Sequence, residues 1–171
     1  MTNPVDDAIR TRRTHKASGG GRVPRETLDE LFELARWAPN HHLTQPWRFR
    51  VVGPEALERL RAAAGPAEAP KLDRAPTLVV ASAKLSGDLL ADEEDLHATA
   101  CAVYIVLLAA HARGLAGYWR TPRVLLTPAG REAVGLEDGE RFVALIHLGE
   151  PTGDRPARER DPAAAFVEYL D

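Results

Sequence analysis

An apolar segment near the middle of the chain constrains the fold more than any other part of the sequence. From Ala98 to Ala110 only Thr99 is not apolar, so a helix built from this segment must be enclosed on nearly all sides. Its unbroken apolar length falls short of the roughly 20 residues that span a bilayer, and we therefore expect the central helix of a folded domain. A chain of 171 residues has only a limited surface in its other elements with which to cover such a helix. A dimer, in which a second copy covers part of the helix, is favoured, and we choose Val106 as a residue that faces the partner.

The rest of the pattern indicates helices interleaved with about four strands in one domain, residues 1–171. The clearest helix lies in "RETLDELFELARWAP", where apolar residues recur at i, i+3, i+4 and i+7 and Pro39 ends the helix. The continuous apolar run "APTLVVASA" predicts a strand that is buried on both faces. Further helices are expected at "VDDAIR" and "PEALERLRAAA", and further strands at "RFRVVG", at "RFVALIHLGEP" and, as a short strand or an extended loop, at "AGYWRT".

Two segments carry weaker patterns. Residues 84–95, "KLSGDLLADEED", are acidic and predict a mobile loop or a frayed helix over an opening. The arginine-rich stretch "TGDRPARERDP" leads into residues 164–171, "AAFVEYLD", which are apolar enough to dock on the fold.

Composition excludes several classes of protein. Hydrophobic residues make up 44% and charged residues 27% of the chain, so neither a disordered nor a fibrous protein is indicated. The net charge of -3 gives no excess of positive potential, which makes nucleic acid a poor partner. A lone cysteine, Cys101, cannot form an intramolecular disulfide, and the start "MTNPVDDAIR" lacks the apolar core of a signal peptide. We expect a cytoplasmic protein that does not enter a membrane.

Basic residues near the start of the chain have the chemistry of a phosphate site. Arg10, Arg12 and Arg13 lie next to Thr14, and guanidinium and hydroxyl groups donate hydrogen bonds to anionic oxygens. The alternative is that these are surface cations that stabilise the end of a helix. No metal-ligand spacing accompanies the two adjacent histidines at 41 and 42, and the chain has no serine elbow, Walker loop or Gly-x-Gly-x-x-Gly motif.

Four segments together resemble the successive signatures of the nitroreductase family, most closely its small single-domain members. They are "AIRTRRTHKAS", "LFELARWAPNHHLTQPWRFRVV", "AGYWRTP" and "VALIHLGEP", in order from about residue 8 to residue 151. The resemblance implies an α+β, three-layer sandwich with a central mixed sheet of about four strands flanked by helices. It also implies a homodimer with FMN at the subunit interface, where both subunits contribute to each site and a nicotinamide donor and an acceptor use the same flavin in turn.

The resemblance also assigns the site residue by residue. The segment Arg12–Thr14 matches an Arg-Arg-Ser that holds the FMN phosphate and the pyrimidine edge of the ring. His41 occupies a position that contacts FMN from the partner chain, while Trp119–Thr121 match a segment that lies along the flavin. Late basic residues of the family contact the phosphate. The implied cofactor-binding residues are Arg12, Arg13, Thr14, Trp37, His41, Trp119, Arg120, Thr121 and Arg160, with Arg158 close to the last.

Two positions depart from the family pattern. Leu43 replaces an asparagine and cannot hydrogen-bond to the cofactor, so His41 or Gln45 must take over some of that work. Lys16 stands where a second arginine is common, and it keeps the positive charge. The implied function is an FMN-dependent oxidoreductase that uses NAD(P)H to reduce nitroaromatic or quinone-like acceptors, with no protein side chain acting as catalytic acid or base. The alternative is a flavin-binding or storage protein with little turnover.

Overall fold

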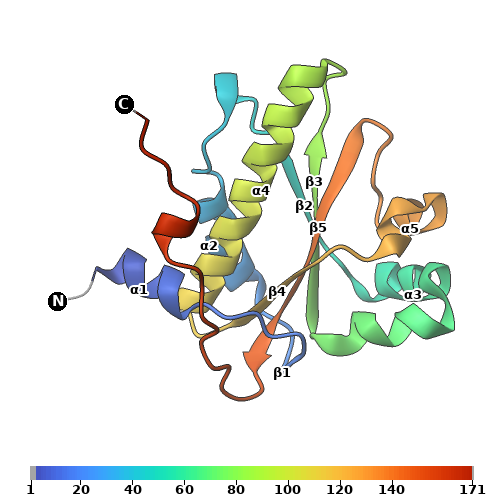
Figure 1. Ribbon diagram of the computed structural model, residues 1–171. Helices are drawn as coiled ribbons and strands as arrows, with labels where there is room; N and C mark the ends of the chain where they lie inside the picture. Colours follow the sequence, from blue (N-terminus) through green and yellow to red (C-terminus); the bar gives the residue numbers. More distant parts are fainter. Residues whose placement is uncertain (1–2, 171) are drawn as a thin grey trace.

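The protein folds as three layers, a central sheet with helices on both faces (Figure 1). The computed structural model describes residues 3–170. The strands are β1 (Ser18–Gly19), β2 (Trp47–Val51), β3 (Thr77–Lys84), β4 (Ala116–Arg120) and β5 (Glu140–Pro151). The helices are α1 (Pro4–Thr11), α2 (Arg25–Ala35), α3 (Pro54–Glu68), α4 (Leu89–Ala112) and α5 (Pro128–Ala133), with 3-10 turns η1 (His41–Leu43), η2 (Ala69–Arg74), η3 (Arg123–Leu126) and η4 (Ala163–Ala165).

The sheet has five strands, and all pairings between its strands are antiparallel. The strands follow the order β1-β5-β3-β2, and β4 also pairs with β5. The expectation of a mixed sheet is therefore wrong in strand direction, and the sheet has five strands where about four were expected. Burial patterns report which residues are covered but not which way a strand runs, and β1 has only two residues, too few to show a pattern. Within the described residues 3–170, parallel pairing is confined to an isolated bridge between Thr14 and Gly117.

Alternate residues of the strands enter two separate cores, because successive side chains of a strand point to opposite faces of the sheet. On β3, Val79 belongs to the core under α2 and α4, whereas Val80 belongs to the core under α3 and α5. Burial of β3 on both faces, as predicted, follows from this arrangement. Gly117 permits the closest approach of α4 to the sheet, since a Cβ there would lie 2.9 Å from a methyl group of Leu107.

The long helix α4 begins earlier than its sequence indicates. The side chain of Asp88 accepts hydrogen bonds from the amides of Leu90 and Ala91, at 3.1 and 2.9 Å, and so caps the helix. Most of residues 84–95, expected as a loop or a frayed helix, therefore belong to α4. Acidic residues are favoured near a helix N-terminus, which explains why this end lacks an apolar pattern. In length and composition α4 could cross a membrane, but it packs in the core of this fold.

The expected enclosure of the apolar helix is only partly achieved within one chain. Val106, which the sequence suggested as a residue facing a partner, is fully buried in the chain's own core, so that choice was wrong. Helical periodicity places residues on faces but does not identify the face that a neighbouring chain would cover. Cys101 and Tyr104 remain exposed instead. The C-terminal segment does not pack on its own chain, since Phe166 and Tyr169 are exposed.

A histidine is buried in the middle of the sheet without a hydrogen-bond partner. His147 of β5 is 2% exposed, and both of its ring nitrogens lack a partner. The ring of Tyr118 lies 5.5 Å away between centroids. Burial, assisted by the positive charges of Arg120 and Arg74, lowers the pKa of His147 to about 4. His147 is therefore neutral near pH 7, and protonation of its ring would place an unpaired charge inside the fold.

Acid should destabilise the protein through this residue. Between pH 6.5 and about 4 the unfolded chain binds a proton at His147 that the native chain does not, so the free energy of unfolding falls as the pH falls. The depressed pKa corresponds to a loss of up to about 3 kcal/mol across that range. We expect His147→Gln to flatten the slope of unfolding free energy against pH in urea titrations. His97→Gln, which removes an exposed histidine of α4, is the control, and parallel curves for His147→Gln and the parent would contradict this account.

Candidate functional site

The end of α1 is held against the sheet, and this fixes the first basic residues. The amide of Arg12 closes the helix by donating to the carbonyl of Ala8. Two residues later, Thr14 forms the bridge with Gly117 of β4, and the amide of His15 donates to the carbonyl of Gly117 at 3.2 Å. The chain after α1 therefore runs in a defined position beside β4.

A pairing of strands brings a second basic segment to the same place. β1 pairs with the last residues of β5, Ser18 with Pro151 and Gly19 with Glu150, so the residues before β1 and after β5 are neighbours. They enclose a pocket of about 500 Å³. Three of its basic residues precede β1 and three follow β5. The lining consists of Arg12, Arg13, Thr14, Lys16, Arg155, Pro156, Arg158 and Arg160.

Every charged side chain in this lining is a cation, and we call the pocket the basic pocket. The Nε atoms of Arg12 and Arg13 are buried without a hydrogen-bond partner. Burial, and then the charge of Arg155, lowers the pKa of His15. Burial, and then the charges of Arg12 and Arg13, lowers the pKa of His111. The six cations and the unpaired donors give the basic pocket a positive potential, which a multivalent anion would neutralise.

The structure therefore brings together five of the residues expected around a phosphate, from both ends of the chain. Lys16, noted as a departure from the family pattern, lines the same pocket. Sequence reasoning missed Arg155, although the run "DRPARER" at residues 154–160 contains it. The register of that run could not be fixed without knowing that β1 pairs with β5. The residues expected around the phosphate are Arg12, Arg13, Thr14, Arg158 and Arg160.

The loop that contains His41 and His42 lies apart from the basic pocket. His41 begins η1, and its Nδ1 lies 2.8 Å from a carboxylate oxygen of Glu94 in α4. The rings of His41 and His42 stack, with centroids 3.9 Å apart. No group of three or more His, Cys, Asp or Glu side chains that could hold a metal ion occurs among residues 3–170. His41 is not part of the basic pocket of its own chain.

Trp37 lies beside an apolar groove between α1, α2 and α4. Its side chain is 75% exposed, and the guanidinium of Arg36 lies 5.8 Å from a ring centroid. The groove has a volume of about 480 Å³. Like His41, Trp37 is separate from the basic pocket within one chain. The groove is lined by Pro4, Val5, Ala8, Leu34, Trp37, Ile105, Leu108, Ala109, Ala112 and Arg113.

The segment expected along the flavin is divided between the two faces of the sheet. Trp119 packs against the core under α2 and α4, on the side of α1. Arg120 points to the other face, where its guanidinium donates to a carboxylate oxygen of Glu68 at 2.7 Å. Thr121 lines a different shallow pocket with Leu85. Of these three residues, Trp119 lies on the face that carries the basic pocket, whereas Arg120 contacts Glu68 through one guanidinium nitrogen and keeps its Nη1 atom buried without a hydrogen-bond partner.

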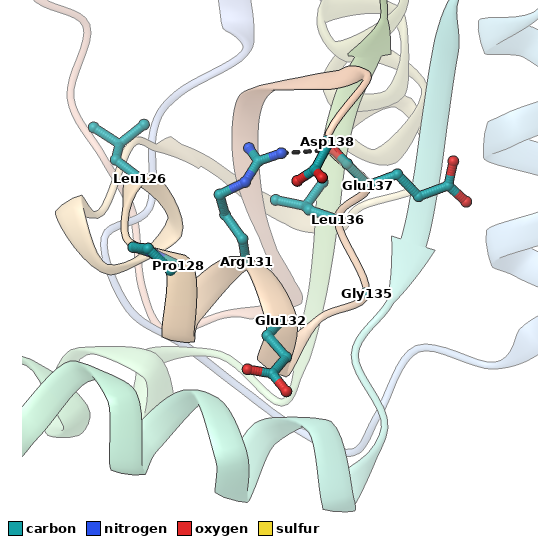
Figure 2. A pocket seen from close by; sticks show the side chains of 8 residues that line it. All are labelled: Leu126, Pro128, Arg131, Glu132, Gly135, Leu136, Glu137 and Asp138. Carbon is teal, nitrogen blue, oxygen red and sulfur yellow. Dashed lines mark hydrogen bonds between the residues drawn. The ribbon is translucent and has the colours of Figure 1, made fainter.

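A further pocket of about 500 Å³ lies between η3, α5 and the start of β5 (Figure 2). Arg131 lies across it and donates to the carbonyl oxygens of Glu137 and Glu140, at 2.6 and 3.1 Å. Figure 2 shows the carboxylates of Glu132 and Asp138 in the same lining. Because carboxylates lie in its walls, this pocket is poorly suited to an anion.

Similarity to known proteins identifies the family of the chain. The model of the nitroreductase family matches residues 9–67, which include Arg12, Arg13 and the His41 loop. The "Putative NAD(P)H nitroreductase YdjA" of Escherichia coli (strain K12) is 30% identical over 141 residues, which cover 74% of this chain and 76% of that protein.

Solved structures share the fold over the whole chain. The crystal structure of the nitroreductase-like family protein from Bacillus cereus superimposes with a TM-score of 0.88 at 24% identity, covering 100% of this chain and 97% of the other. A "putative nitroreductase in complex with FMN" from Desulfovibrio desulfuricans superimposes with a TM-score of 0.81 at 26% identity, covering 100% and 99%. On the family model and on the relative from Escherichia coli, the chain belongs to the nitroreductase family.

Proposed function

We propose that the protein is an FMN-dependent oxidoreductase that uses NAD(P)H to reduce nitroaromatic or quinone-like acceptors by a ping-pong hydride transfer. The observation that carries the proposal is the basic pocket, whose lining among residues 3–170 contains six cations and a threonine hydroxyl and no acidic side chain. A relative of the same fold is described in complex with FMN, and another is named an NAD(P)H nitroreductase.

The residues present fit the phosphate end of FMN. The buried Nε atoms of Arg12 and Arg13 lack acceptors, and a phosphate carries several acceptor oxygens close together. Arg158 and Arg160 reach the pocket from the other side. A dianionic phosphate would remove the mutual repulsion of these cations, so its binding should be strongly favourable and dependent on salt.

The cofactor would supply the hydride chemistry, and the chain needs only to bind, orient and shield it. The cations of the basic pocket would hold one end of the cofactor in place. The face of the sheet that carries Trp119 would support the ring. No side chain is required to act as a general acid or base, which agrees with the lack of a nucleophile or dyad motif in the sequence.

Two copies are needed to complete the proposed site. Within one chain, Trp37 and His41 do not line the basic pocket, so they could meet a cofactor held there only from another chain. The apolar groove between α1, α2 and α4 is the surface that a second copy would cover. Val5 and Trp37 are 62% and 75% exposed on it, and large exposed apolar surfaces mark sites of association.

The purified protein should bind FMN, and NADPH or NADH should then bleach the flavin absorption under anaerobic conditions. Subsequent addition of a nitroaromatic or quinone should restore the absorption. A colourless protein that does not bind added FMN would refute the proposal. FMN that stays yellow with either nicotinamide would instead support the flavin-storage alternative.

Replacing Arg12 and Arg13 together with alanine should weaken FMN binding by several kcal/mol at most, because hydrogen bonds to charged groups contribute roughly 1.5–3 kcal/mol each. Quenching of FMN fluorescence would measure the change. The control is the pair Arg25→Ala and Arg123→Ala, which removes the same charge from exposed positions outside the basic pocket. If the two double variants bind FMN equally well, the arginines of the basic pocket only stabilise the end of α1.

Dimerisation and FMN binding should be lost together. Val5→Glu places a charge on the exposed part of the apolar groove, where it would be buried against a second copy at high cost. Light scattering combined with flavin absorption should show a monomer without FMN. Leu126→Glu, at an apolar residue 66% exposed near α5, should remain a dimer with FMN. A folded monomer that retains FMN would contradict the shared site.

A further inference from the structure

The loop between α2 and β2 has a strained backbone. Burial of apolar side chains does not offset the energetic cost of this strain. His42, Leu43 and Gln45 have φ angles of 52°, 52° and 45°, in the left-handed region that residues other than glycine rarely adopt. Residues 41–45 are all exposed. Such a conformation persists only where surrounding contacts impose it, and it is most common at functional sites.

Polar contacts are what hold this loop, and the strongest ones come from α4. The hydroxyl of Thr44 donates to a carboxylate oxygen of Asp95 at 2.6 Å. His41 contacts Glu94 at 2.8 Å. Within the loop, the side chain of Asn40 accepts a hydrogen bond from the amide of Gln45 at 2.9 Å. Two adjacent carboxylates of one helix therefore reach both ends of the 3-10 turn.

Burial distinguishes the two carboxylates. Asp95 is 6% exposed, whereas the side chains of His41 and Glu94 are 60% and 42% exposed. An exposed ion pair contributes little because water and salt screen it. A short hydrogen bond to a buried carboxylate is shielded, and its loss would leave the carboxylate without that donor. Asp95 is also fixed in space, since α4 continues into the core through Val103.

We propose that Asp95 is a positioning residue for the cofactor site. Through Thr44 it keeps the loop in the left-handed conformation and so presents His41 at the surface where a second copy would supply the basic pocket. The inference rests on the proposed function. It assigns a role to the acidic start of α4, which the sequence alone presented as a loop. A loop held in its binding conformation binds more tightly, because apparent affinity scales with the population of the competent state.

The test is Thr44→Val, which removes the donor at an exposed position and leaves Asp95 in place. We expect FMN affinity to fall about tenfold, the lower end of what a hydrogen bond to a charged group supports. Thr44→Ser keeps the hydroxyl and should bind FMN like the parent protein. Thr27→Val makes the same chemical change in α2 and is the matched control.

Two further measurements separate positioning from general stability. In the absence of FMN, Thr44→Val should exchange its amide hydrogens faster at residues 41–46 while its melting temperature stays close to that of the parent. Asp95→Ala combined with Thr44→Val should bind FMN no more weakly than Asp95→Ala alone, since both changes remove one interaction. FMN affinity of Thr44→Val within about twofold of the parent would overturn the role of Asp95 and leave the proposed function intact. A parent protein that does not bind FMN would refute the proposed function itself.

Discussion

The pairing of β1 with the end of β5 is the contact on which the basic pocket depends. It joins Ser18 to Pro151 and Gly19 to Glu150, and so holds two cationic segments together that lie far apart in sequence. Like charges near a protein surface repel by up to about 4 kcal/mol at 4 Å, and the fold must offset this repulsion elsewhere. The pKa values of His15 and His111 are lowered mainly by burial, and the positive charges of Arg155 and of Arg12 and Arg13, respectively, add to the effect. An anion in the pocket would relieve the repulsion, so binding and folding are coupled.

Two of the remaining expected site residues lie apart from the basic pocket within one chain. Trp37 and His41 lie beside α4, away from the basic pocket, while the surface between α1, α2 and α4 is apolar and open. Our account joins these facts by placing a second copy on that surface. The strained His41 loop and the buried carboxylate of Asp95 then belong to one half of a shared site, and the basic pocket belongs to the other.

Much of the fold could be predicted from the sequence because burial leaves a periodic pattern. The helical spacing around Leu31 and the apolar run around Val79 are both confirmed by the structure. Strand direction, the short β1 and the early start of α4 were missed or misassigned, since none of them produces an apolar period. Val106 was misplaced for a related reason, because an all-apolar helix has no polar face to mark its orientation.

The candidate site could be predicted only for residues that belong to one short segment of the sequence. Arg12 and Arg13 were assigned through the family resemblance of their segment, whereas placing Arg155 beside them requires knowledge of a long-range strand pairing. Arg120 was expected along the flavin, but alternation along β4 turns it toward Glu68 on the opposite face. Asp95 could not be found at all from the sequence, because its partner Thr44 is 51 residues away.

Subunit complementation tests the shared site most directly. One chain would carry Arg12→Ala and Arg13→Ala, and a second, with a different affinity tag, would carry His41→Ala and Trp37→Ala. Purified through both tags, the mixed dimer has one site built entirely from native halves and another that carries all four changes. We predict that it binds FMN at one site with the affinity of the parent protein, although each altered homodimer binds weakly. A mixed dimer that binds no better than the altered homodimers would contradict a site shared between two chains.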